Sequence, residues 1–265
     1  MRVFEIPEGS KNSKGRASQN LINIEQDDRV KAFICTQDLK DEDYVNNHYV
    51  IMATKMGQVK KTSLEQYSRP RSNGINAITV KDGDELLEAK LTNGNSQIML
   101  AVKSGKAIRF EEGKTRPMGR NASGVRGIRL KDNKDEVVGM ISVNDMDANI
   151  LVVSENGYGK RSSLEDYRLT NRGGKGVKTI SITEKTGKLV TLKSVSDSDD
   201  LMIINKSGIA IRMQVEDLRV MGRATQGVKV ISLKDGDSIA AVAKVMKDDD
   251  DIEDINDIEF TGDAV

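Results

Sequence analysis

Short runs of consecutive apolar residues recur along the chain, and each run is followed by a turn that ends in glycine. Four such runs begin at Val50, Ile98, Ile150 and Leu201. An apolar run of this length, bounded by turn residues, is typical of a β-strand. Beyond each turn a second strand follows, with a basic residue four positions after the glycine. The pattern therefore predicts the same β-hairpin four times.

The turn glycines define a repeat. They are Gly57, Gly105, Gly157 and Gly208, spaced 48, 52 and 51 residues apart. A second glycine follows 17, 19, 19 and 19 residues after the first, at Gly74, Gly124, Gly176 and Gly227. A period of about 50 residues made of short strands is typical of propeller-like arrays, in which four-stranded units are arranged radially.

The predicted fold is accordingly all-β and propeller-like, with about 50 residues in each four-stranded blade. We expect one domain over residues 1–247, with four full repeats and a partial first one, because residues 14–35 match only the later half of a unit. The predicted units are a partial blade at 1–47 and full blades at 48–95, 96–147, 148–198 and 199–247, followed by an acidic disordered tail at 248–265.

Charge is unevenly distributed along the 265 residues. Lys and Arg together number 41 and so do Asp and Glu, but residues 248–265 hold nine acids and no base, which leaves residues 1–247 with a net charge of +9. A basic body with an acidic arm suggests that the body binds a polyanion and that the arm competes for the same surface. A solubilising disordered terminus explains the tail equally well.

Basic residues recur at equivalent places in the repeats, and these are our candidate DNA contacts. The bases at strand ends are Lys61, Arg109, Arg161 and Arg212, and those in the loops before the second glycines are Arg69, Arg71, Arg116, Arg120, Arg168, Arg172, Lys175, Arg219 and Arg223. Bases at matching positions of successive blades can neutralise the regular line of phosphates on a duplex without reading base identity. With 4 Phe, 5 Tyr and no Trp, the chain has few aromatic platforms for single strands.

Enzymatic and membrane functions find little support in the sequence. The single histidine, His48, is expected to be a loop residue, because no second His or Cys completes a metal-ligand set around it. The single cysteine, Cys35, is expected to be a small buried hydrophobe. No apolar run approaches the ~18 residues of a membrane span, and no signal peptide is evident, so we expect a cytoplasmic protein without a membrane partner.

Several short sequence segments resemble the C-terminal DNA-wrapping domain of the DNA gyrase A protein, which belongs to the type IIA topoisomerases. They stand at residues 57–62, 82–86, 119–129, 156–161 and 222–227. The resemblance covers residues 1–247 and is incomplete at the N-terminal side. It implies a β-pinwheel, a disc of blades that exchange strands with their neighbours and bend duplex DNA around a basic rim. It also implies that the catalytic tyrosine and the ATPase domain are absent from this chain.

The same resemblance implies partners and cofactors. The partners are duplex DNA, the gyrase B subunit and the rest of the gyrase A subunit. The chain itself is expected to need no cofactor, whereas the holoenzyme uses ATP and Mg²⁺ for negative supercoiling, in association with the nucleoid.

Residues 171–176, Asn-Arg-Gly-Gly-Lys-Gly, resemble the glycine-rich box of this family. The family normally carries the box in the first blade, but here it stands in the last repeat but one. Either the box has moved in this lineage, or the first blade has been cut away with its own copy. The glycines Gly173, Gly174 and Gly176 are expected to bring backbone N–H groups close to a phosphate, flanked by Arg172 and Lys175.

Two other functions stay open from the sequence. One is a DNA-binding domain like that of topoisomerase IV, which binds without a strong wrap. The other is a propeller-type scaffold that binds an acidic protein. The repeated basic loops favour DNA over the scaffold, and the box favours gyrase over topoisomerase IV.

Overall fold

The computed structural model describes residues 3–9, 16–17, 20–22, 24, 28–71 and 73–245. Its first sheet is built from three strands of one repeat, β1 (Tyr49–Thr54), β2 (Gln58–Ser63) and β3 (Leu86–Thr92). A fourth strand, β6 (Val125–Arg126), comes from the next repeat and pairs antiparallel with β2, which gives the order β3-β1-β2-β6. Neighbouring repeats are therefore joined by strand exchange.

The second and third sheets repeat this arrangement. Each again takes its outermost strand from the repeat that follows, in the orders β10-β5-β4-β7 and β11-β8-β9-β14. The strands are β4 (Gln97–Val102), β5 (Lys106–Glu111), β7 (Val137–Val143), β8 (Asn149–Ser154), β9 (Tyr158–Ser163), β10 (Val177–Lys178), β11 (Leu189–Val195) and β14 (Val228–Lys229).

The fourth sheet has three strands among the described residues, in the order β13-β12-β15. They are β12 (Asp200–Asn205), β13 (Ala210–Gln214) and β15 (Ile239–Val245). The prediction of four strands in every blade is thus met for three of the four sheets. The outermost strand of the other sheets is supplied by a following repeat, and the described part of the chain has no strand after β15.

Besides the strands, the described residues contain one short α-helix and several 3₁₀ turns. One α-helix, α1 (Glu42–Asn47), begins at Asp41, whose carboxylate accepts a hydrogen bond of 3.1 Å from the Tyr44 amide. Four 3₁₀ turns are present in the described residues: η1 (Val3–Glu5), η3 (Leu64–Tyr67), η4 (Glu112–Lys114) and η5 (Leu164–Asp166). The sequence pattern did not predict α1, because six residues are too few for a helical periodicity to be visible.

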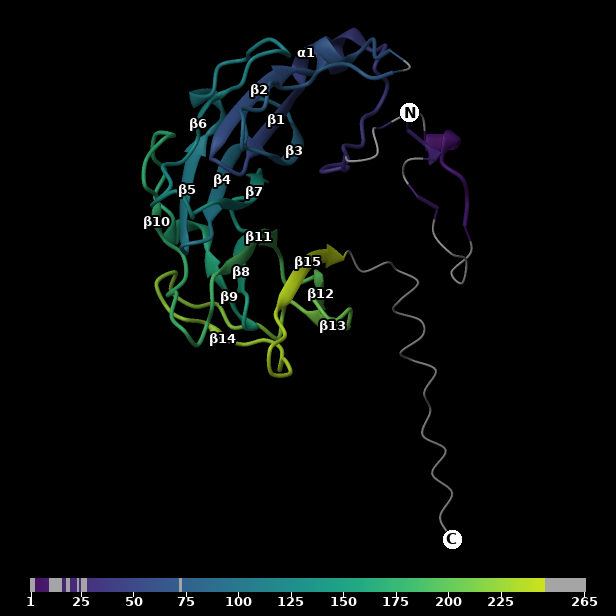
Figure 1. The fold of residues 1–265 in the computed structure, drawn as a ribbon. Coiled ribbons are helices and arrows are strands. Elements are labelled where there is room, and N and C mark those ends of the chain that lie inside the picture. Colours follow the sequence, from purple (N-terminus) through teal and green to yellow (C-terminus); the bar gives the residue numbers. More distant parts are fainter. Residues whose placement is uncertain are drawn as a thin grey trace.

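The four sheets stand side by side in an arc (Figure 1), with β3, β7, β11 and β15 on its inner side and β6, β10 and β14 on its outer side. Adjacent sheets pack face to face. Between the first two, Ile51 and Val59 meet Leu100 and Ile108, all at most 2 % exposed. The central strands β1, β4 and β8 are buried on both faces, so their inner residues are apolar without interruption, which explains the runs in the sequence. In β12, Met202 and Ile204 are only half-buried.

Described residues of the predicted partial blade, 1–47, form no strand, although Ala32, Ile34 and Leu39 pack on the first sheet. The prediction that Cys35 is buried is wrong, since this thiol is exposed. The segment is extended, and alternate residues point to opposite sides, so that Ala32 and Ile34 face the sheet while Phe33 and Cys35 face away. The predicted acidic tail lies outside the described residues.

Candidate nucleic-acid interface

Three loops, here called the rim loops, run along the outer side of the arc. They are residues 116–126, 168–178 and 219–229, and each crosses the hairpin of the preceding repeat. Where each loop begins, a backbone N–H bonds to the strand-end base of that hairpin: Met118 to the Lys61 carbonyl (2.8 Å), Thr170 to Arg109 (2.9 Å) and Met221 to Arg161 (2.8 Å). A rim loop thus belongs to one repeat in sequence but lies on another in space.

Each rim loop closes on a glycine that no other residue can replace without strain. Gly124, Gly176 and Gly227 have φ of +89°, +70° and +81°. A Cβ at each of them would lie 2.5 Å from a backbone oxygen of the preceding repeat, at Val59, Ala107 and Gly159 respectively. The second glycine of the sequence repeat is therefore required both by its backbone angle and by close contact.

Replacing Gly176 by alanine is expected to lower the free energy of unfolding by about 1–3 kcal/mol, because the substitution adds positive-φ strain to a clash with the Ala107 carbonyl. Urea unfolding of the full chain measures this loss. Gly119→Ala is the matched control, since a Cβ there meets nothing within 4 Å. Equal losses for the two variants would contradict the assignment.

Three basic positions recur in every rim loop, eight and four residues before the closing glycine and two residues after it. They are Arg116, Arg120 and Arg126 in the first, Arg168, Arg172 and Lys178 in the second, and Arg219, Arg223 and Lys229 in the third. The outer two of each set are exposed and the middle arginine is half-buried. The bases two residues after the closing glycine, Arg126, Lys178 and Lys229, were missed from the sequence. Its signal was present as the base that follows Gly-Val in three repeats.

The middle arginines link each loop to the one before it. The Arg172 Nη1 donates to the Arg126 carbonyl at 3.1 Å, and the Arg223 Nη1 donates to the Lys178 carbonyl at 2.8 Å. The Arg120 Nη1 lies 3.5 Å from the Asn76 carbonyl in the corresponding place. These guanidinium groups fix the spacing between neighbouring loops and leave only part of their donors for a ligand.

The glycine-rich box is part of this connection between loops. The Gly173 amide donates to the Gly127 carbonyl at 2.6 Å, and the Gly174 carbonyl accepts from the Arg129 amide at 2.8 Å. The expectation that the Gly173 N–H faces a phosphate needs correction, because that N–H is already paired within the protein. The exposed charge of the box comes from Lys175.

Two of the four strand-end bases do not face the outside, so their predicted role as DNA contacts needs correction. Lys61 is 4 % exposed, and its Nζ lies 2.8 Å from the Glu112 carboxylate and 4.0 Å from the centre of the Tyr49 ring. Arg161 is 7 % exposed and bonds to the Leu218 carbonyl and the Asp197 carboxylate. Both side chains attach a sheet to the next repeat.

The other two strand-end bases are less enclosed. The Arg109 Nη1 donates to the carbonyl oxygens of Leu164 (2.9 Å) and Tyr167 (3.0 Å), and burial lowers the pKa of this guanidinium. Arg212 is exposed and forms an ion pair of 2.7 Å with Asp200. Since alternate strand residues point to opposite faces, a base at this position in the first three sheets points into the junction with the next blade, as Lys61, Arg109 and Arg161 do.

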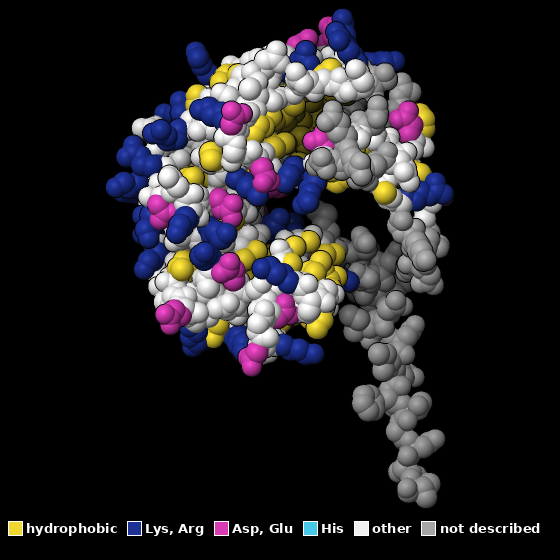
Figure 2. All heavy atoms as spheres, in the orientation of Figure 1, with side chains coloured by type: hydrophobic (Ala, Val, Ile, Leu, Met, Phe, Trp, Pro, Cys, Tyr) yellow, Lys and Arg dark blue, Asp and Glu magenta, His cyan; other side chains and the backbone are white. Residues whose placement is uncertain are grey.

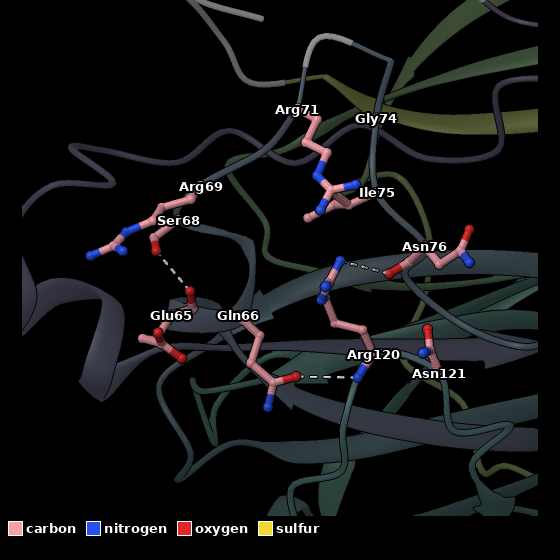
Figure 3. A pocket seen from close by; sticks show the side chains of 10 residues that line it. All are labelled: Glu65, Gln66, Ser68, Arg69, Arg71, Gly74, Ile75, Asn76, Arg120 and Asn121. Atoms are coloured by element: carbon pink, nitrogen blue, oxygen red, sulfur yellow. Dashed lines mark hydrogen bonds between the residues drawn. The ribbon is translucent and has the colours of Figure 1, made fainter.

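Two surface pockets bring predicted residues together. The larger, of about 710 Å³, is lined by Arg69, Arg71 and Arg120 together with Gln66 and Asn76 (Figure 3). In it the Arg120 amide donates to the Gln66 side-chain oxygen at 3.2 Å.

The smaller pocket, of about 160 Å³, is lined by Arg109, Arg168, Gly174, Lys175 and Gly176. Three arginines line the larger pocket, and two arginines and a lysine line the smaller one, so both have the character of an anion-binding surface.

Lys and Arg side chains gather along the outer edge of the arc (Figure 2), where β6, β10 and β14 and the rim loops lie. In the described residues, no group of three His, Cys, Asp or Glu side chains is placed to hold a metal ion. No helix in that part of the chain is long and apolar enough to cross a membrane. His48 lies between α1 and β1, with its Nδ1 2.8 Å from the Tyr44 carbonyl oxygen.

An arc of sheets with exchanged outer strands, carrying bases at matching positions of its outer side, defines a β-propeller-like repeat domain of the pinwheel type. The sequence model of the family described as DNA gyrase C-terminal domain, beta-propeller, matches residues 1–37, 48–93, 97–144, 148–196 and 199–255. The chain belongs to this family.

Relatives and solved structures agree with this assignment. The DNA gyrase A subunit of Staphylococcus epidermidis is 43% identical over 251 residues, which are 94% of this chain and 28% of the relative. The corresponding protein of Staphylococcus aureus is 43% identical over 253 residues, 95% of this chain and 28% of the relative. The chain thus spans little more than a quarter of these relatives' length.

Among solved structures, the C-terminal domain of DNA topoisomerase IV is similar with a TM-score of 0.82 and 26% identity, covering 92% of this chain and 74% of that one. A DNA gyrase A C-terminal domain is similar with a TM-score of 0.78 and 25% identity, covering 93% and 78%. The predicted all-β pinwheel and the resemblance to the gyrase family are both confirmed.

Proposed function

We propose that the chain binds duplex DNA without sequence specificity and bends it along the outer side of the arc, as the C-terminal module of a DNA gyrase A subunit. The observation that carries this proposal is the threefold repetition of exposed bases at the same offsets from the glycines Gly124, Gly176 and Gly227. Charges repeated at fixed offsets on successive blades fit the regular phosphate line of a duplex, and their array follows a curve.

In this function the chain is a non-catalytic part of a type II topoisomerase. It works with the gyrase B subunit, together with the rest of the gyrase A subunit. By bending DNA it supports ATP-dependent negative supercoiling by the holoenzyme, which uses ATP and Mg²⁺ in parts outside this chain. The place of action is the cytoplasm, on the nucleoid.

The test is ligation of nicked circular plasmid in the presence of increasing amounts of the full chain, followed by measurement of linking number. We expect a shift that grows with protein concentration and disappears as salt is raised, because counterion release drives the binding. A plasmid bound without a shift in linking number would contradict chiral wrapping. Absence of binding at low salt would contradict the DNA function as a whole and favour a protein scaffold.

A second candidate is DNA binding without a strong wrap. It is favoured by one observation, the similarity to the topoisomerase IV C-terminal domain, which is as good as that to the gyrase domain. The same linking-number experiment separates the two candidates, since only a wrap of fixed handedness changes linking number.

A further inference from the structure

Two lysines are completely buried beneath rim loops. Lys60 and Lys160 are each 0 % exposed. The Lys60 Nζ donates to the Arg120 carbonyl in the first rim loop and to the Ala77 carbonyl at 2.5 Å. The Lys160 Nζ donates to the Gly222 carbonyl (2.6 Å) and to the Thr225 hydroxyl (3.1 Å) in the third rim loop. Each side chain therefore joins its own strand to the middle of a loop from the following repeat.

The remaining sheets have an apolar residue at the same strand position. Ile108 in β5 and Ile211 in β13 occupy the place of Lys60 and Lys160, one residue before the strand-end base. The second rim loop, which crosses β5, is the one that carries the glycine-rich box and is held by the backbone bonds of Gly173 and Gly174. Two rim loops are thus attached by a buried lysine. The loop without one has instead the bond from the Gly173 amide to the Gly127 carbonyl, whereas the bond to the Gly174 carbonyl has counterparts at Ala122 and Thr225 in the other two loops.

Burial of these two ammonium groups has an electrostatic cost. Their hydrogen-bond acceptors are neutral carbonyl and hydroxyl oxygens. Desolvation lowers the pKa of both lysines to about 8, with a smaller contribution from Arg120 at Lys60 and from Arg223 at Lys160. Hydrophobic residues would fill these positions without that cost, as they do at Ile108. A charged donor is therefore retained where a loop needs an attachment.

We infer that Lys60 and Lys160 are positioning residues, each of which holds a basic rim loop at a fixed place on the outer side of the arc. That the loops bind DNA rests on the proposed function, but the attachment of the loops by the lysines is measured without DNA. In the bound state the lysines touch no phosphate. They act through Arg116, Arg120 and Arg126 in one loop and through Arg219, Arg223 and Lys229 in the other.

The attachment is expected to weaken as pH rises through about 8, because a neutral amine is a weaker donor than an ammonium. Charged and titratable groups around Lys60 are Arg120 and Tyr67, whose hydroxyl also reaches the Ala77 carbonyl. Those around Lys160 are Asp166, which raises its pKa, and Arg223, which lowers it.

Global stability changes in the opposite direction over the same pH range. The folded state binds fewer protons on these lysines than the unfolded state between about pH 8 and the ordinary lysine pKa of 10.5. Their contribution to the free energy of unfolding therefore rises with pH across that interval. Release of the loops with increasing pH is accordingly distinguishable from unfolding.

Limited trypsin digestion of the full chain tests the attachment. In Lys60→Met, cleavage after Arg120 is expected to accelerate about tenfold relative to cleavage after the exposed Lys185, while cleavage after Arg223 stays unchanged. In Lys160→Met the pattern reverses. The matched control is Ile211→Met, at the equivalent strand position without a described loop above it, which leaves both ratios unchanged.

The pH dependence of the cleavage ratio shows whether Lys60 holds the loop through its charged hydrogen bonds or only fills space beneath it. In the wild type the Arg120 to Lys185 cleavage ratio is expected to rise between pH 7 and 9, and in Lys60→Met it is high and independent of pH. Unchanged ratios in both lysine variants overturn the inference, as does a flat profile in the wild type. If the ratios change as expected but the wild type binds no plasmid DNA, the proposed function fails and the attachment stands.

Discussion

Replacing Lys61 by methionine is expected to destabilise the chain by about 3–5 kcal/mol, because the substitution leaves a buried carboxylate without its counterion. Glu112 is 0 % exposed, and besides Lys61 it accepts from the Thr92 hydroxyl at 2.8 Å and from the Ser96 amide at 3.2 Å. Those two neutral donors do not replace a cation. Urea unfolding of the full chain, followed by circular dichroism, measures the loss.

The double variant Lys61→Met with Glu112→Leu is the control for this prediction. Removing both charges together is expected to recover most of the lost stability, since a buried ion pair is often replaced by apolar residues at little cost. A single variant as stable as the wild type would contradict the assignment of this pair as a junction between the first two blades.

Replacing the three exposed bases of the exchanged strands, Arg126, Lys178 and Lys229, by glutamine is expected to weaken DNA binding by about two orders of magnitude at 0.1 M salt. Each base that neutralises one phosphate contributes about 0.9 to the slope of log affinity against log salt. The triple variant should therefore have a slope smaller by about 2.7. Titration of a labelled duplex at several salt concentrations measures both quantities.

A variant of equal charge change provides the control. Lys131, Lys134 and Lys234 are exposed lysines outside the exchanged strands and the rim loops, and their replacement by glutamine is expected to change the slope little. An equal loss in both triple variants would show that net charge alone sets the affinity. An unchanged slope in the first variant would exclude the exchanged strands from the interface.

The repeat was visible in the sequence because the packing of the blades imposes it. A central strand such as β8 lies between two other sheets, so its residues 150–153 must be apolar, and the run stands out without an alignment. The closing glycine was visible for a similar reason, since its positive φ and its contact with the preceding hairpin exclude side chains. Period, hairpins and loop positions follow from these local requirements.

The sequence did not show which way the individual basic side chains point. Lys60 and Lys61 are adjacent in the sequence, yet one holds a rim loop and the other pairs with Glu112 in the junction between blades. Arg126 looked like an ordinary strand residue until its pairing with Gln58 of the preceding repeat placed it at the outer edge. Residue type gave the charge of these positions but not their surroundings.

By itself, the sequence determined that this protein is a repeated all-β domain of the gyrase C-terminal family with a base-rich loop in each unit, because strand burial and glycine turns are encoded locally. Only the tertiary structure decided which bases lie on the outer side and which are used to join the blades. The physical reason is strand exchange: each rim loop lies on the preceding repeat, so the strand partners of Arg126, Lys178 and Lys229 are 68 to 72 residues away in the chain.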